Sequence, residues 1–144
     1  MPRLIADTSG LLAGMAAKHP AHHKVRSALA EADEPPVVSP LVLAEVDYML
    51  ASRLGAAGSL QAIDALTNGG FEIPTIGEED LLAARPLLAK YADLNIGLTD
   101  AINVILADRY RTDSILTLDH RHFRVIRPLH SQTPSFRLIP ADLG

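Results

Sequence analysis

Short runs of aliphatic residues alternate along the chain with longer segments in which apolar residues recur every three or four positions. The short runs lack the polar alternation of half-exposed strands, so they predict about five buried β-strands, at residues 3–6, 37–39, 71–76, 114–118 and 123–126. The longer segments predict helices at residues 11–17, 20–32, 40–54, 59–67, 77–91 and 99–110. This alternation is typical of an α/β protein, with a mostly parallel sheet between two layers of helices.

Helix-capping residues add detail to two of these helices. Ser39 and Pro40 are typical of an N-cap and a first helical position, and Thr99 is the predicted cap of helix 99–110. Helix 40–54 is apolar around most of its circumference, which predicts burial on more than one side.

The length of 144 residues predicts one domain, spanning 1–144. Its core is expected at about 3–128, because residues 129–144 are rich in turn-forming residues and predict a tail. With 48% hydrophobic and 21% charged residues, the chain can build a substantial core and is not a disordered segment.

The composition also excludes several kinds of function. The absence of cysteine excludes a disulfide scaffold, a thiolate zinc site and a cysteine nucleophile. Aromatic residues make up only 4% of the chain and Trp is absent, which argues against a protein that stacks single-stranded bases on aromatic rings. No secretory segment precedes the first strand and no apolar run approaches the roughly 20 residues of a membrane-spanning helix, so we expect a cytoplasmic protein.

The charge is unevenly distributed along the chain. A net charge of −4 argues against binding nucleic acid through bulk attraction. Yet six of the 13 Lys and Arg residues are arginines within residues 109–137, a segment that holds only two acids. This segment is either a solvated basic edge or a rim of arginines that contacts phosphate.

Four acidic residues are candidates for a shared site. Asp7 follows the first predicted strand, Asp119 follows strand 114–118, and Asp100 begins the helix that leads into that strand. Because the carboxyl ends of parallel strands meet at one edge of a sheet, these three acids are expected to lie close together. Glu45 shares a helix face with apolar residues, where a carboxylate needs a partner or a cleft, and Asp47 in the same helix is its competitor.

Each acid taken alone also has an ordinary structural explanation. Asp7 and Asp119 can cap turns or helices, Asp100 can favour a helix dipole, and Glu45 can reach water at the edge of a buried helix. Together, however, these acids would repel one another strongly unless a divalent cation neutralised them. Oxygen donors suit Mg²⁺ or Mn²⁺, and such a site beside arginines is suited to phosphodiester hydrolysis. Which acid serves as general base stays open.

The segments around these acids resemble known motifs. They read DTS at 7–9, SPLVLAEV at 39–46, YADLNIGLTDA at 91–101 and LTLDHRHF at 116–123. In this order they resemble the four acidic motifs of PIN domains, over about residues 3–128, and the last has a form typical of VapC-like toxins of toxin–antitoxin pairs. The resemblance implies a PIN-like three-layer sandwich and a magnesium-dependent endoribonuclease. It also implies a homodimer and a cognate VapB-like antitoxin whose tail inhibits the enzyme from a groove near the active site.

The resemblance also assigns roles to individual residues. It selects Glu45 over Asp47 and makes Asp7 and Asp100 the principal metal ligands. Asp119 would complete the site or a second metal position, and Glu45 would act through water or orient the nucleophile. Ser9 and Thr117 are candidate supporting hydroxyls.

Some residues near these motifs are given lesser roles. Asp93 is expected to stabilise a loop, with direct involvement as the alternative. His120 and His122 flank Asp119, and contact with a phosphate or a leaving oxygen is a minor alternative for them.

Two further features have ordinary explanations. His19, His22 and His23 have a spacing that can chelate a transition metal, but no acid or thiolate accompanies them, so a solvated helix start is favoured. The helices at 40–54 and 59–67 carry few charges, and apolar surface left exposed there would suit an antitoxin helix or a second subunit.

Two other functions compete with the nuclease hypothesis. A non-cutting PIN-like module would bind or regulate RNA, although it would gain nothing from four mutually repelling acids. An aspartyl-phosphate phosphotransferase also places an Asp after the first strand, but Ser9 stands where its second acid is expected.

Overall fold

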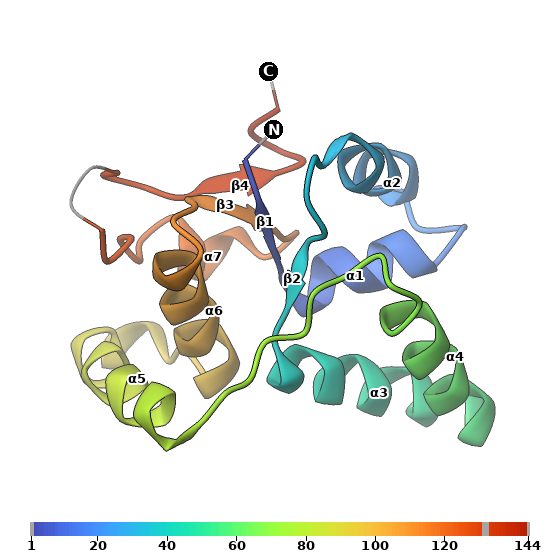
Figure 1. The fold of residues 1–144 in the computed structure, drawn as a ribbon, viewed down its shortest axis with the longest axis horizontal. Coiled ribbons are helices and arrows are strands. Elements are labelled where there is room, and N and C mark those ends of the chain that lie inside the picture. Colours follow the sequence, from blue (N-terminus) through green and yellow to red (C-terminus); the bar gives the residue numbers. More distant parts are fainter. Residues whose placement is uncertain (1, 131–132, 144) are drawn as a thin grey trace.

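The computed structural model describes residues 2–130 and 133–143, and within them four short parallel strands form one sheet (Figure 1). The strand order is β2-β1-β3-β4, with strand bounds β1 (Leu4–Ala6), β2 (Val37–Val38), β3 (Ser114–Leu116) and β4 (Arg137–Ile139). Each strand pairs in parallel with its neighbour, and Ile5 is in register with both Val37 and Ile115. The predicted parallel sheet is thereby confirmed, with four strands in place of about five.

Helices cover both faces of the sheet (Figure 1). The helices are α1 (Thr8–Met15), α2 (His22–Glu31), α3 (Pro40–Leu54), α4 (Ala56–Leu66), α5 (Glu78–Lys90), α6 (Leu98–Arg109) and α7 (His120–Phe123), with a 3₁₀ turn η1 (Ala92–Leu94). Successive strand residues point to opposite faces, so Ile5 packs with α5 and α6 while Leu4 packs with α1 to α4. The three-layer α/β/α architecture is therefore confirmed.

Two predicted strands are wrong. The 71–76 segment contributes only one bridge, between Val37 and Glu72, because Pro74 has no backbone N–H with which to extend the pairing. The 123–126 segment is the end of α7 and a turn. Phe123 and Ile126 are both buried, and their spacing of three places them on one face of a helical turn, whereas in a strand they would point to opposite faces.

The fourth strand comes from the segment that we expected to be a turn-rich tail. β4 pairs with β3, and Leu138 and Ile139 are fully buried in the two halves of the core. Asp142 holds this end of the chain in place: it accepts a hydrogen bond from the Leu138 amide at 2.7 Å and two from the Arg124 guanidinium, each at 2.7 Å. The core thus extends beyond the expected boundary at 128.

Replacing Asp142 with Asn is expected to destabilise the protein at neutral pH. The Arg124 guanidinium and the Leu138 amide lower the pKa of Asp142 to about 2, so its carboxylate stabilises the folded state above its unfolded pKa. Because the ion pair is partly exposed, we expect the free energy of unfolding to fall by only about 1 kcal/mol. Thermal unfolding should show a difference at pH 7 that disappears as the pH falls from about 4 towards 2. The exposed Asp64→Asn is the control, and an equal loss in both variants would contradict the prediction.

Helix α3 has the predicted bounds and is buried on more than one side, although part of its surface stays exposed. The Ser39 hydroxyl accepts a hydrogen bond from the Leu41 amide, and Pro40 occupies the first helical position. The helix packs against α1 and α4, and Leu41 lies against the other half of the core, yet Tyr48 is 73% exposed and Met49 is 39% exposed. Helix α4 begins at Ala56, directly after a chain reversal at Gly55 with φ +66°, and earlier than predicted.

Across the part of the chain that the structure describes, no helix has both the length and the apolar character needed to cross a bilayer.

Candidate functional site

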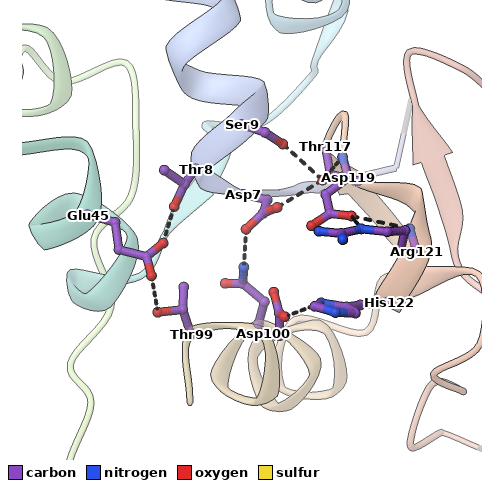
Figure 2. Close-up of polar contacts among 11 residues, drawn as sticks. Asp7, Thr8, Ser9, Glu45, Thr99, Asp100, Thr117, Asp119, Arg121 and His122 are labelled. Atoms are coloured by element: carbon purple, nitrogen blue, oxygen red, sulfur yellow. Dashed lines mark hydrogen bonds and ion pairs between the residues drawn. The ribbon is translucent and has the colours of Figure 1, made fainter. Parts of the chain in front are cut away.

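Four acids from four separate segments line one cleft at the carboxyl end of the sheet (Figure 2). Asp7 directly follows β1 and is the N-cap of α1, while Asp119 follows β3 and caps α7. Asp100 lies in the first turn of α6, and Glu45 projects from α3. The cleft has a volume of about 370 Å³. The structure therefore brings together the four acids singled out from the sequence, whereas Asp47 is not among the residues that line the cleft.

Asp7 is the most buried of these acids, with only 7% of its surface exposed. The Thr117 hydroxyl donates to its Oδ2 at 2.8 Å, and the Asn103 amide donates to its Oδ1 at 3.3 Å. Burial raises the pKa of Asp7 to about 6; the hydrogen bond from Thr117 opposes this rise, and the charges of Asp100 and Glu45 add to it. The free carboxylate is therefore costly in this position and is favoured by a nearby cation.

Ser9 and Thr117, the predicted supporting hydroxyls, connect the start of α1 to the end of β3. Their oxygens lie 3.2 Å apart, and Ser9 Oγ also accepts from the Leu118 amide at 2.9 Å. Thr117 Oγ1 accepts from the Asp119 amide at 3.0 Å while it donates to Asp7. One threonine thus contacts two of the four acids.

Glu45 is held by two hydroxyl groups that the sequence analysis did not assign to the site. Thr8 donates to Oε1 at 2.6 Å and Thr99 donates to Oε2 at 2.9 Å. The prediction of Thr99 as a helix cap is wrong, because Gly97 occupies the cap position and Thr99 is the second residue of the helix. Its hydroxyl instead fixes the orientation of Glu45 across the cleft (Figure 2).

Asp100 and Asp119 each have a partner on α7. The His122 ring donates from Nδ1 to Asp100 Oδ2 at 2.7 Å, and burial raises the pKa of Asp100 despite this hydrogen bond. Asp119 accepts from the Arg121 backbone amide at 3.2 Å and from its Nε at 3.4 Å. His122 therefore contacts a carboxylate. His120 is exposed and lines a different cavity, beside α2.

Asp93 and the histidines near α2 lie outside the cleft. Asp93 is exposed on η1, which agrees with a loop position. His22 contacts the carbonyl oxygen of Ala13 through Nδ1, at 2.9 Å. Within residues 2–130 and 133–143, no three His, Cys, Asp or Glu side chains form a ready-made metal-ligand group.

The acids of the cleft nevertheless fit a hard divalent cation. All four offer oxygen atoms, and the pKa values of Asp7 and Asp100 are raised by burial and by neighbouring negative charge. Mg²⁺ usually retains several water molecules and binds one or two carboxylates directly, so it does not need three converging side chains. All four acids line the same cleft and could hold such an ion.

The arginine-rich segment does not form one continuous rim. Arg109 pairs with Asp80 on α5, and Arg124 pairs with Asp142. Arg121 stands beside Asp119, and together with Arg53 of α3 it lines a second cavity of about 530 Å³ that adjoins the cleft. Most of this second cavity is apolar, with Leu12 and Met49 shared between the two hollows. Arg109 and Arg124 are thus engaged in ion pairs, and contact of the segment's other arginines with phosphate stays a prediction.

Asn103 was missed by the sequence analysis, although a signal for it existed. It lies three residues after Asp100, and residues three apart share one face of a helix. A polar residue at that spacing, within the otherwise apolar stretch 101–107, indicates a second group directed at the same cleft.

Comparison with known proteins shows which family the chain belongs to. The PIN domain family model matches residues 4–128. Ribonuclease VapC26 of Mycobacterium tuberculosis is 44% identical over 126 residues, which cover 88% of this chain and 93% of VapC26. The chain therefore belongs to the PIN-domain family, whose nucleases typically depend on metal ions. Within that family, its similarity to VapC26 places it among the VapC ribonucleases.

Solved structures share the fold at low sequence identity. The Mycobacterium tuberculosis toxin VapC20, described as cleaving the Sarcin–Ricin loop, has a TM-score of 0.73 at 17% identity and covers 81% of this chain and 89% of its own. VapBC2 from Rickettsia felis, bound to a promoter DNA fragment, has a TM-score of 0.65 at 15% identity, with coverages of 94% and 96%. A toxin–antitoxin complex from Klebsiella pneumoniae has a TM-score of 0.63 at 19% identity, with coverages of 86% and 92%.

Proposed function

We propose that the chain is a toxin-type endoribonuclease that hydrolyses RNA phosphodiester bonds with Mg²⁺ or Mn²⁺. The observation that carries this proposal is the convergence of Asp7, Glu45, Asp100 and Asp119, from four separate segments, on one cleft. Burying Asp7 beside other acids costs stability, and that cost is hard to explain without a cation that the site binds. The family and the name of the 44% identical relative support the same activity.

In this proposal Asp7 and Asp100 would hold the ion directly, and Asp119 would complete the site or a second metal position. When bound, the ion supplies charge neutralisation at the scissile phosphate and makes a nearby water more acidic. Glu45 accepts hydrogen bonds from Thr8 and Thr99, so its carboxylate is fixed in orientation and is placed to align a water. Arg121, at the border of the cleft and the adjoining cavity, is placed to contact a phosphate of the RNA.

We also propose that the enzyme acts in the cytoplasm, as a homodimer, and that a VapB-like antitoxin inhibits it. Two of the similar solved structures are described as a toxin–antitoxin complex and as VapBC2, which supports an antitoxin partner. The apolar surface of α3 and α4 supports a protein contact, because Leu54, Leu60 and Ile63 are 54%, 65% and 46% exposed.

Removing the metal or neutralising Glu45 is expected to stop or slow cleavage. The purified chain should cut an RNA substrate with Mg²⁺ or Mn²⁺, and EDTA should abolish the cut. Glu45→Gln should reduce the rate by about 10²-fold, the usual effect of losing a positioned acid–base group. Asp47→Asn, on the same helix and outside the cleft, is the matched control and should leave the rate unchanged. Cleavage that persists in EDTA would refute the proposed mechanism, and RNA binding without any cleavage would favour a non-cutting module.

A further inference from the structure

Asn103 is a buried side chain whose hydrogen bonding is only half satisfied. It has no exposed surface, and its neighbours on α6, Ile102 and Val104, are buried aliphatic residues. Its Nδ2 donates to Asp7 Oδ1 at 3.3 Å, while its Oδ1 has no hydrogen-bond partner among the residues that the structure describes. A buried amide oxygen without a partner destabilises a fold, and leucine would fill a similar volume without that cost. Packing therefore does not explain an asparagine at this position.

The one polar contact of Asn103 is to the acid at the centre of the cleft. Thr117 donates to one oxygen of Asp7 and Asn103 donates to the other, so one donor directly after β3 and one on α6 fix the plane of the carboxylate. The amide is neutral, which distinguishes it from an Arg or Lys in the same place. A cationic partner would compete with a metal ion for Asp7, whereas the amide orients the carboxylate and leaves its charge in place.

Asn103 also connects the two acids proposed to hold the ion. It stands three residues after Asp100 on α6, so a single rigid helix carries Asp100 and the donor that contacts Asp7. We propose that Asn103 is a positioning residue that sets Asp7 against Asp100 for a divalent cation, an inference that rests on the proposed function. The unpaired oxygen of Asn103 destabilises the fold, and this cost is accepted because the amide group is needed at Asp7.

The test separates metal binding from folding by replacing Asn103 with Leu in the full chain. Calorimetric titration with Mn²⁺, without RNA, should show an affinity about tenfold weaker than that of the wild type, as is typical when a group that orients a metal ligand is lost. Without metal, the variant should unfold at the same temperature as the wild type or at a higher one. With RNA, kcat at limiting Mn²⁺ should fall and recover at high Mn²⁺, while KM for RNA stays the same.

A second variant addresses misfolding of the leucine variant, and a control addresses the general effect of removing a buried polar group. Asn103→Ser introduces no bulk and replaces the leucine variant in the experiment if that variant does not fold. It should show the same loss of Mn²⁺ affinity. Ser114→Ala replaces another buried polar residue, whose hydroxyl donates to Asp113 and lies outside the residues that line the cleft, and it should bind Mn²⁺ as the wild type does. Folded Asn103 variants with Mn²⁺ affinity within twofold of the wild type would overturn this inference alone. A wild type that neither binds Mn²⁺ nor cuts RNA would overturn the proposed function and this inference with it.

Discussion

Replacing Asp7 with Asn is expected to remove RNA cleavage and, in the same protein, to raise the unfolding temperature of the metal-free state. Burial raises the pKa of Asp7 from 3.8 to about 6, so at pH 7 the folded chain carries a carboxylate that its surroundings disfavour. A carboxyl group with a higher pKa in the folded than in the unfolded chain destabilises the fold as the pH rises through that interval. The amide of Asn carries no such charge and still accepts a hydrogen bond from Thr117.

The stability gain should amount to about 1–3 kcal/mol at pH 7, where the upper value corresponds to the full shift in pKa. Thermal unfolding without metal should show almost no difference between variant and wild type near pH 4, a growing difference up to about pH 6, and a constant one above it. Saturating Mg²⁺ should stabilise the wild type and leave the variant unaffected, because only the wild type binds the ion. Cleavage should fall by about 10³-fold, the scale on which removing one electrostatic group slows such reactions.

Asp93→Asn serves as the control for this experiment, because Asp93 is exposed on η1 and lies away from the cleft. It should change neither the unfolding temperature nor the rate of cleavage. A metal-free Asp7→Asn protein that is less stable than the wild type at pH 7 would show that the carboxylate is satisfied by its hydrogen bonds alone.

The grouping of the acids was predictable because it depends on a general property of parallel sheets. The strands that precede Asp7 and Asp119 are β1 and β3, which are neighbours in the sheet and run in the same direction. Residues that follow such strands must lie at the same edge, whatever the details of packing. Each strand could be recognised because it is a continuous aliphatic run that ends in a polar residue.

The contacts that orient the acids could not be predicted in the same way. Thr99 has the local pattern of a helix cap, yet its hydroxyl donates to Glu45, which lies 54 positions earlier in the chain. Strand β4 has only three residues, and its pairing with β3 depends on a long-range contact that no local periodicity encodes. The 123–126 segment was ambiguous because periodicity alone does not distinguish a buried strand from a helical turn in so short an apolar run.

A substitution that widens the gap between α1 and β3 is expected to damage the site without touching an acid. Gly10 packs directly on β3, and a β-carbon at this position would lie 2.5 Å from the carbonyl oxygen of Leu116. Gly10→Ala must therefore push α1 away from the strand, and the same movement separates Asp7 and Ser9 from Thr117. We expect a loss of about 1–3 kcal/mol in the free energy of unfolding. We also expect Mn²⁺ affinity to fall at least about tenfold and cleavage to fall about 10²-fold.

Gly58 provides a matched control for this prediction. A β-carbon there would lie 2.3 Å from the carbonyl oxygen of Leu50, so Gly58→Ala creates a similar overlap between α3 and α4, outside the residues that line the cleft. Its unfolding free energy should fall by a similar amount, about 1–3 kcal/mol. At a temperature well below the unfolding temperatures of both variants, the Mn²⁺ affinity and the cleavage rate of Gly58→Ala should stay close to those of the wild type. If the two variants lose activity only in proportion to stability, then the α1–β3 spacing does not set the geometry of Asp7. If Gly10→Ala alone loses metal binding, then the close packing of Gly10 on β3 is required to form the site.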